Sequence, residues 1–252
     1  MGHNFSSTFL HNIVVLIGCT KYPKKIIFME IIATVHLIPN IVANPYLIMD
    51  PDGLTLIDTG LPGNHRKILN YMTGLGYSPS DLKRIFITHA DMDHTGSLYA
   101  LKKASGACVY ASAVESEAMS KGRSSRQIKP KNFFRRLLMG VVSRFMKAAP
   151  VRADEILSEG QVLPVLGGLR VMETSGHTPG HVSLFSPSTG ILFTGDSIVA
   201  REGGLVRSIQ ALTWDQAKAD ESARKQAALG AHIVCSGHGP VVMDAEDKFP
   251  KI

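Results

Sequence analysis

Four side chains of types that bind metal ions lie within six positions of the sequence. The stretch Ile87–Ser97 reads ITHADMDHTGS and carries His89, Asp91, Asp93 and His94 behind an apolar run. Imidazole nitrogens and carboxylate oxygens are common ligands of divalent cations, and a rigid element must aim them. The spacing predicts a buried strand that ends here and presents these side chains at the edge of a sheet.

Three further polar residues follow apolar runs, and each has a glycine beside it. They are His177 in SGHTPGH, Asp196 in FTGDS and His238 in CSGHGP. One such residue alone is more often a structural residue or a turn cap. Seven together, with four in one short run, predict a metal centre built on loops that a sheet positions.

The apolar periodicity predicts the elements that must position these residues. Strand patterns occur in the first half at 31–38, 44–50, 54–60, 82–90 and 107–112, and in the second half at 169–176, 181–187, 190–196 and 231–242. Helical spacing covers 65–76, 95–106 and 214–230. Two βαβ-like halves separated by a helical middle predict a layered α/β domain.

Length and composition bound the organisation. The chain has 252 residues, with 44% hydrophobic and 19% charged residues, which predicts a sizeable buried core. We expect one domain over residues 29–252, behind an N-terminal extension, residues 1–28, of uncertain status. The extension has a short apolar stretch that faintly resembles a lipoprotein cleavage box, and Met29 is an alternative start. Three widely spaced cysteines and no bilayer-length apolar run predict a cytoplasmic protein without stable membrane insertion.

The segment from Ala118 to Ala153 carries ten basic residues and no acidic one, against a formal net charge of +6 for the whole chain. Its apolar residues recur at helical spacing, which predicts a basic amphipathic helical insertion at about 115–153. A surface helix on the core is the simplest interpretation. A lid over the site, a surface facing a membrane or nucleic acid, and packing against a second subunit in a homodimer are the alternatives.

Together these residues resemble the metallo-β-lactamase-fold superfamily, whose motif HxHxDH is followed by a distant His, an Asp in a GD turn and a final His. The resemblance covers roughly residues 30–243 and includes LIDTG with Asp58. It implies a four-layer αββα sandwich with a helical insertion between the two halves. Here the motif is HxDxDH, because Asp91 stands where the family usually has its second histidine.

Carried over by position, the resemblance implies two divalent metal ions. His89, Asp91 and His177 would hold the first, Asp93, His94 and His238 the second, and Asp196 would bridge them. Asp91 adds a hard oxygen ligand and a negative charge, so iron or manganese are alternatives to zinc, which we expect first.

The activity that this site predicts is hydrolysis. A metal-bridging hydroxide would attack the carbonyl of an ester, lactone or thioester in a small-molecule substrate, with β-lactamase activity as a possible side reaction. Asp93 and Asp58 are the expected catalytic residues, Asp93 as a metal ligand and Asp58 behind a ligand histidine. His181 is a second candidate for orienting a ligand histidine, and position suggests Tyr46, His65 and Ile198 as substrate contacts.

Two other classes stay open from the sequence. A diiron redox protein related to flavodiiron proteins would use Asp91 as its harder ligand. A metal-dependent ribonuclease would use the basic segment, although that segment lacks interleaved surface aromatics for base stacking, so we do not expect nucleic acid as a partner.

Overall fold

The first β-sheet contains seven strands in chain order. Strands β1 to β4 form an antiparallel meander, and β4 to β7 run parallel to one another. The computed structural model describes residues 27–126, 148–201 and 204–252. The strands are β1 (Met29–Ile32), β2 (Val35–Leu37), β3 (Tyr46–Asp50), β4 (Gly53–Ile57), β5 (Leu82–Phe86), β6 (Cys108–Ala111) and β7 (Glu155–Ile156).

The second sheet has six strands in the order β15-β14-β11-β10-β9-β8. Its neighbours are antiparallel except β11 and β14, which run parallel. A separate antiparallel hairpin joins β12 and β13. The strands are β8 (Val162–Leu163), β9 (Leu169–Glu173), β10 (Val182–Ser186), β11 (Ile191–Gly195), β12 (Ile198–Arg201), β13 (Gly204–Arg207), β14 (Ile233–Ser236) and β15 (Val242–Met243).

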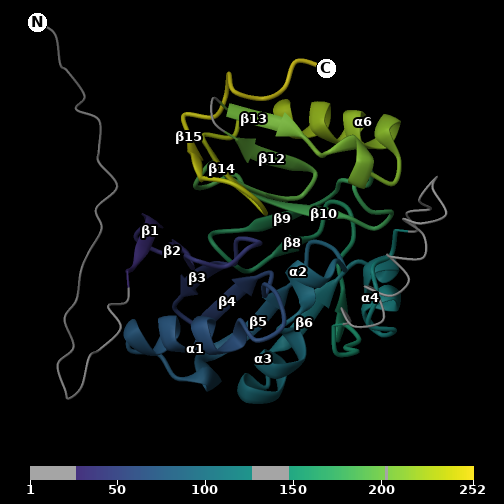
Figure 1. Cartoon of the computed structure of the whole chain (residues 1–252). Helices are drawn as coiled ribbons and strands as arrows, with labels where there is room; N and C mark the ends of the chain where they lie inside the picture. The colour runs from purple at the N-terminus through teal and green to yellow at the C-terminus, as the bar shows by residue number, and fades with distance from the viewer. Residues whose placement is uncertain (1–26, 127–147, 202–203) are drawn as a thin grey trace, which may run out of the picture.

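Helices cover the outer face of each sheet, as Figure 1 shows. Helices α1, α3 and α4 contribute to the apolar cluster on the first sheet, and α6 contributes to the cluster on the second. The helices are α1 (His65–Gly74), α2 (Met92–Thr95), α3 (Leu98–Ser105), α4 (Ala113–Met119) and α6 (Gln216–Ala227), with single 3-10 turns η1 (Pro79–Asp81) and η2 (Gln210–Leu212). The predicted four-layer αββα sandwich is therefore confirmed.

Alternation along the strands explains the layers. Successive side chains of a strand point to opposite faces, so a strand buried on both sides is apolar throughout. In β3, Leu47 packs towards the helices and Tyr46 towards the other sheet. In β11, Leu192 faces α6 and Phe193 packs between the sheets, where its ring meets that of Tyr46 edge-on at 5.4 Å.

Several local predictions were wrong. The expected strand at 31–38 is interrupted by a turn after Ile32, so it forms β1 and β2. The second half, expected to be βαβ-like, is mainly an antiparallel sheet, and in it only β11 and β14 are joined by a parallel crossover. The β12–β13 hairpin was not predicted.

The basic amphipathic helical insertion expected at about 115–153 stays a prediction. Helix α4 ends at Met119, and the amphipathic run at 127–147 lies outside the described residues, as does most of the N-terminal extension.

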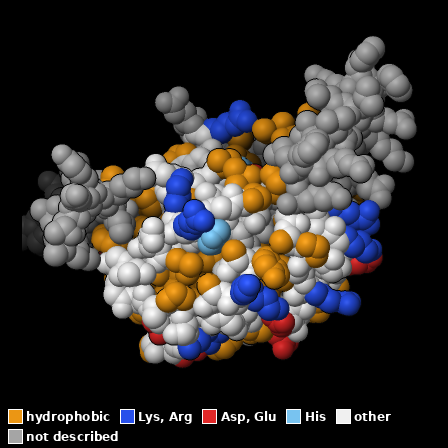
Figure 2. Space-filling model, turned by 60° about the horizontal axis from the view of Figure 1, so that its bottom comes forward, with side chains coloured by type: hydrophobic (Ala, Val, Ile, Leu, Met, Phe, Trp, Pro, Cys, Tyr) orange, Lys and Arg blue, Asp and Glu red, His pale blue; other side chains and the backbone are white. Residues whose placement is uncertain are grey.

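Surface charge is spread rather than gathered on the face seen in Figure 2. Lys and Arg side chains there lie scattered among hydrophobic ones, and the few acidic side chains lie towards its lower and right-hand margins. Among the described residues, no helix is both long and apolar enough to cross a membrane.

Candidate metal centre

All seven candidate ligands follow the carboxyl ends of strands. The motif run at 89–94 follows β5, which is parallel to β4 and β6. His177, Asp196 and His238 follow β9, β11 and β14, which share one direction because β9 and β11 are both antiparallel to β10 and β14 is parallel to β11. Their loops therefore emerge at one edge of the second sheet, where open α/β sheets place their sites.

A single helical turn folds the motif run compactly. Asp91 is the extended residue before α2, and Asp93 and His94 lie within this turn. The backbone nitrogen of His94 donates to the Asp91 carbonyl at 3.0 Å, which closes the turn. The strand end and the turn thus direct the four side chains into one region.

The seven side chains form groups of metal-binding size. Three sets of ligand atoms each lie within 4.8 Å of one another: His89, Asp91 and His177; Asp93, His94 and His238; and His89, His94 and Asp196. The first two sets are those expected for the two metals. Asp196 lies between them.

The spacing of the ligand atoms fits a shared cation. The Nε2 atoms of His177 and His238 lie 3.6 and 3.4 Å from Asp196 Oδ2, and His94 Nε2 lies 3.4 Å from Asp196 Oδ1. Metal–ligand bonds of about 2.0–2.2 Å in tetrahedral geometry place neighbouring ligand atoms about 3.3–3.6 Å apart. These distances fit that geometry.

Buried polar atoms that find no hydrogen-bond partner among the described residues face this space. They are Nε2 of His89, His94 and His177, and Oδ1 of Asp196. A buried polar atom without a partner is costly, so four at one place indicate a binding site. Nitrogen and oxygen atoms with free lone pairs bind a cation, so the residues fit the metal ions that the fold implies.

Asp58 orients two of the histidines. Its Oδ2 accepts from His94 Nδ1 at 2.7 Å and from the Thr88 hydroxyl at 2.8 Å. The same hydroxyl lies 3.0 Å from His89 Nδ1, so its oxygen can accept that N–H. Both imidazoles then carry their proton on Nδ1 and leave Nε2 free for a metal, which is the behaviour expected of a residue behind the ligands.

His181 has a different contact from the one expected. Its Nε2 accepts from the backbone nitrogen of Asp196 at 3.1 Å, and its Nδ1 lies 2.9 Å from the Thr174 hydroxyl. Burial holds the pKa of His181 well below its ordinary value, so it stays neutral and keeps this acceptor. It fixes the backbone of Asp196 rather than a ligand histidine.

The carboxylates and imidazoles shift each other's pKa. Hydrogen bonds with Asp196 and Asp93 raise the pKa of His238 to about 9. Burial alone would raise the pKa of Asp196, but the neighbouring His94 and His238 hold it well below its ordinary range. The carboxylates thus stay ionised and favour positive charge in the space between them.

Glu115 was missed from the sequence, although it is fully buried on α4. Its Oε1 accepts from the hydroxyls of Thr178 and Ser125, both at 2.7 Å, and from the backbone nitrogen of Gly180 at 2.9 Å. Its Oε2 accepts from the backbone nitrogen of Ala90 at 2.9 Å. One carboxylate therefore ties together the loops that carry three of the expected ligands of the first metal.

Two more residues missed from the sequence hold Asp91. The Ser124 hydroxyl donates to Asp91 Oδ1, and the Arg126 guanidinium forms an ion pair with Asp91 Oδ2. The same Oδ2 lies 3.6 Å from His89 Nε2 and 3.4 Å from His177 Nε2. Burial would raise the pKa of Asp91, but the adjacent imidazoles of His177 and His89 and the charge of Arg126 hold it well below its ordinary range.

Gly237 lets the loop that carries His238 lie close to two other ligands. A Cβ on Gly237 would overlap Asp196 Oδ1 and lie 2.8 Å from His94 Cε1. The glycine beside His238 in the sequence therefore reflects close approach of backbone to two ligands.

A cavity of about 400 Å³ opens onto the ligands. Its lining combines five of the ligands with two arginines, a serine and an apolar wall: Asp91, Asp93, His177, Asp196, His238, Arg126, Arg201, Ser208, Val199, Ala200, Ile209 and Leu212. The substrate contacts suggested from position were wrong. Ile198 packs into the core, and neither Tyr46 nor His65 is among the lining residues.

The sequence comparison identifies the family. Residues 39–238 match the model of the metallo-beta-lactamase superfamily, and the chain belongs to this superfamily of metallo-hydrolases. It is 29% identical over 216 residues to YobT of Bacillus subtilis (strain 168), covering 82% of this chain and 87% of YobT. It is 28% identical over 218 residues to the probable metallo-hydrolase YflN of the same organism, covering 79% and 81%.

A further relative and a solved structure are also similar to this chain. The hydroxyacylglutathione hydrolase of Cereibacter sphaeroides (strain ATCC 17029 / ATH 2.4.9) is 28% identical over 160 residues, which are 62% of this chain and 48% of that protein. A metallo-beta-lactamase family protein from Thermus thermophilus superposes with a TM-score of 0.68 at 22% identity, covering 87% of this chain and 78% of that one. At this identity the structure supports the fold alone.

Proposed function

We propose that this protein hydrolyses an ester, lactone or thioester of a small molecule with two divalent metal ions, zinc in the first instance. The observation that carries the proposal is the convergence of three buried Nε2 atoms and one buried carboxylate oxygen that have no hydrogen-bond partner in the described part of the chain. Two of the residues that carry these atoms, His177 and Asp196, line a cavity large enough for a small substrate.

Each side chain has a role in this reaction. His89, Asp91 and His177 would hold one ion, and Asp93, His94 and His238 the other, with Asp196 between them. When bound, the ions supply a nucleophilic water near neutral pH and a Lewis acid for the carbonyl oxygen. Because that water is the nucleophile, no serine or cysteine nucleophile is required. Asp58 and Thr88 keep two imidazoles in the ligating tautomer.

The cavity walls favour a substrate with an apolar part beside its carbonyl. Val199, Ala200, Ile209 and Leu212 are among its lining residues, and an acyl or alkyl group against them would be shielded from water. Arg201 lines the same cavity and can meet a negative group on the substrate. The relative named hydroxyacylglutathione hydrolase supports including an acyl-glutathione among the test substrates.

The test begins with metal content. Protein purified without added metal is analysed by elemental mass spectrometry and assayed against esters, lactones, thioesters and a β-lactam, before and after chelation. We expect two zinc ions per chain and hydrolysis that a chelator abolishes. Iron with a visible absorption band, and no hydrolysis of any panel member, would instead support the diiron redox alternative.

Variants separate the centre from general effects. Asp196→Asn, which weakens a ligand to both ions, should lose metal and hydrolysis together. His232→Ala is the matched control, because His232 is an exposed histidine that pairs with Glu246. Unchanged metal content in Asp196→Asn would contradict the proposed centre.

A further inference from the structure

The carboxylate of Asp91 has a set of partners that the other candidate carboxylate ligands lack. Ser124 donates to one of its oxygens, and the Arg126 guanidinium pairs with the other. Asp93 and Asp196 pair only with histidines among the described residues. Asp91 is thus the one ligand of this centre that the described part of the chain provides with a permanent cation.

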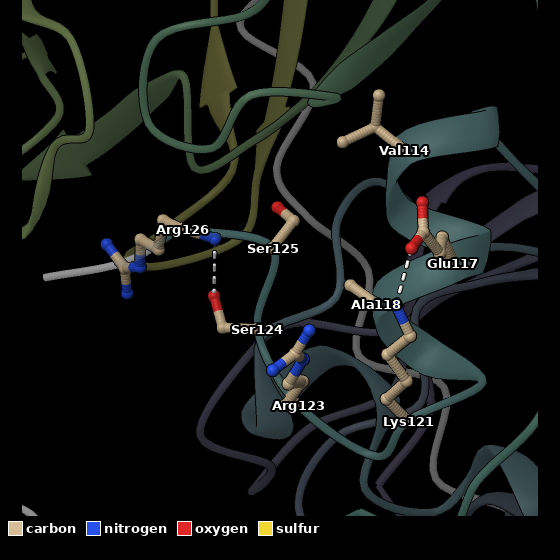
Figure 3. Close-up of a pocket in the computed structure, with 8 residues that line it drawn as sticks. All are labelled: Val114, Glu117, Ala118, Lys121, Arg123, Ser124, Ser125 and Arg126. Atoms are coloured by element: carbon tan, nitrogen blue, oxygen red, sulfur yellow. Dashed lines mark hydrogen bonds and ion pairs between the residues drawn. The ribbon is translucent and has the colours of Figure 1, made fainter.

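Arg126 is held from two sides. Nη2 contacts Asp91, and Nη1 donates to the carbonyl of Leu212 in η2. Figure 3 shows its side chain directed away from α4, while its backbone nitrogen donates to Ser124 Oγ at 3.3 Å. The side chains of Arg126 and Asp91 are 13% and 9% exposed, so their pairing is largely shielded from water.

The summed charge of the centre shows what the pairing of Arg126 with Asp91 changes. Two divalent ions and the carboxylates of Asp91, Asp93 and Asp196 sum to one positive charge. Arg126 adds one more, which offsets the carboxylate of Asp91 while leaving its oxygen beside two imidazole nitrogens. A buried carboxylate without a cation is costly, so the empty centre also needs this partner.

We propose that Arg126 and Ser124 are positioning residues for Asp91. They fix its carboxylate in a ligating orientation and cancel its charge, so that Asp91 binds the first metal without adding net charge to the centre. The inference rests on the metal centre proposed above.

Opposite effects on the empty and the loaded protein follow from this arrangement. Without the guanidinium, the metal-free protein buries an unpaired carboxylate and loses stability. Ser124 still donates to Oδ1 of Asp91, so the carboxylate keeps its ligating orientation. The first ion is then the only permanent cation beside Asp91 and is no longer repelled by the guanidinium, so it binds more tightly.

A double-mutant cycle tests the pairing. Arg126→Met is made in the wild-type chain and in Asp91→Asn, and melting of the chelated proteins is compared. We expect Arg126→Met to lower Tm by about 5 °C or more in the wild type, and by less than half as much in the Asp91→Asn background. By chelator competition, Arg126→Met should bind the first ion about tenfold more tightly than wild type.

Two further variants sharpen the result. Arg126→Lys keeps the charge, so its metal affinity should stay near that of wild type. Arg123→Met removes a neighbouring cation that lines the adjacent pocket in Figure 3, and should change neither Tm nor affinity. An equal Tm loss in both backgrounds with unchanged metal affinity would mean that Arg126 only anchors η2, and would overturn the inference.

The metal centre itself is checked separately. A wild-type chain that takes up no ion would refute the proposed function and the ligand part of this inference. An absence of coupling between Arg126 and Asp91, in a chain that holds two ions, would refute the inference and leave the proposed function intact.

Discussion

Replacement of Glu115 should destabilise the protein more than replacement of any exposed acidic residue on the same helix. Its carboxylate is fully buried and accepts four hydrogen bonds, two of them from the backbone nitrogens of Ala90 and Gly180. The other two come from the hydroxyls of Ser125 and Thr178, which can rotate towards other acceptors. The cost of Glu115→Ala therefore depends mainly on the two backbone donors.

The expected magnitude follows from those donors. A buried donor left without an acceptor costs about 1–3 kcal/mol, so two cost roughly 2–6 kcal/mol. For a chain of this size, each kcal/mol lowers Tm by about 2–4 °C. Glu115→Gln should cost less, about 1–3 kcal/mol, because its amide oxygen replaces Oε1 and only the Ala90 nitrogen then faces a donor.

The effect should also reach the metal centre. Ala90 lies between His89 and Asp91, and Thr178 follows His177, so Glu115 anchors the loops on both sides of the first metal. Loosening these loops should weaken metal binding as well as folding.

The assay is thermal melting of the chelated and the metal-loaded protein, together with chelator competition. Glu117→Gln is the matched control, because Glu117 lies on the same helix, is exposed and pairs only with Lys121 among the described residues. Its Tm should stay within about 2 °C of wild type. A Glu115→Ala protein that melts within the same range would refute the argument that this carboxylate holds the loops together.

Three further predictions concern single residues. Asp58→Asn replaces an acceptor of the His94 N–H, so metal affinity measured by chelator competition should fall about 10–100-fold. Asp91→His replaces an oxygen ligand with an imidazole and should raise the preference for zinc over manganese in competition experiments, whereas an unchanged preference would mean that Asp91 does not bind the metal. Burial lowers the pKa of His36, whose ring bonds to the Tyr71 hydroxyl at 2.9 Å. The unfolded chain therefore binds the His36 proton at higher pH than the folded chain, and the free energy of unfolding should decrease as pH falls below about 6.5. His36→Gln should flatten this decrease in denaturation curves taken across that range, and an unchanged slope would exclude His36 as its source.

Much of the fold could be predicted because strand ends and ligand positions are local signals. The apolar run of β5 followed by His89, and the glycine before Asp196, report backbone geometry within a few residues. The β12–β13 hairpin could not be predicted in the same way, because its strands have only four residues each and directly follow the ligand loop of β11. The pairing of the second sheet could not be predicted, because antiparallel order depends on partners that are distant in the sequence.

The residues around the ligands could not be predicted for a different reason. Glu115 and Arg126 lie in a segment whose composition is polar and basic, and nothing near them in the sequence marks them as buried. Their partners lie 25 and 35 positions away, and the contacts exist only after α4 has packed on the first sheet. A metal ligand can be predicted from the sequence because it stands directly after the apolar pattern of the strand that carries it. A residue that holds the ligand can come from any element that packs beside that strand.

The same distinction explains why Asp91 alone gives an incomplete account of the centre. Its sequence position indicates a harder and more negative first metal site, which pointed towards iron or manganese. The partners of its carboxylate counter the charge, because Arg126 supplies one positive unit and Ser124 a hydrogen bond. The carboxylate oxygen of Asp91 is still a harder ligand than an imidazole nitrogen. The charge of Arg126, however, cancels the negative charge of Asp91, so a substrate meets the same net charge as it would with a histidine at this position. Metal choice should therefore depend on Asp91 itself, whereas attraction of a negative substrate should depend on Arg126, and the two properties can be changed separately.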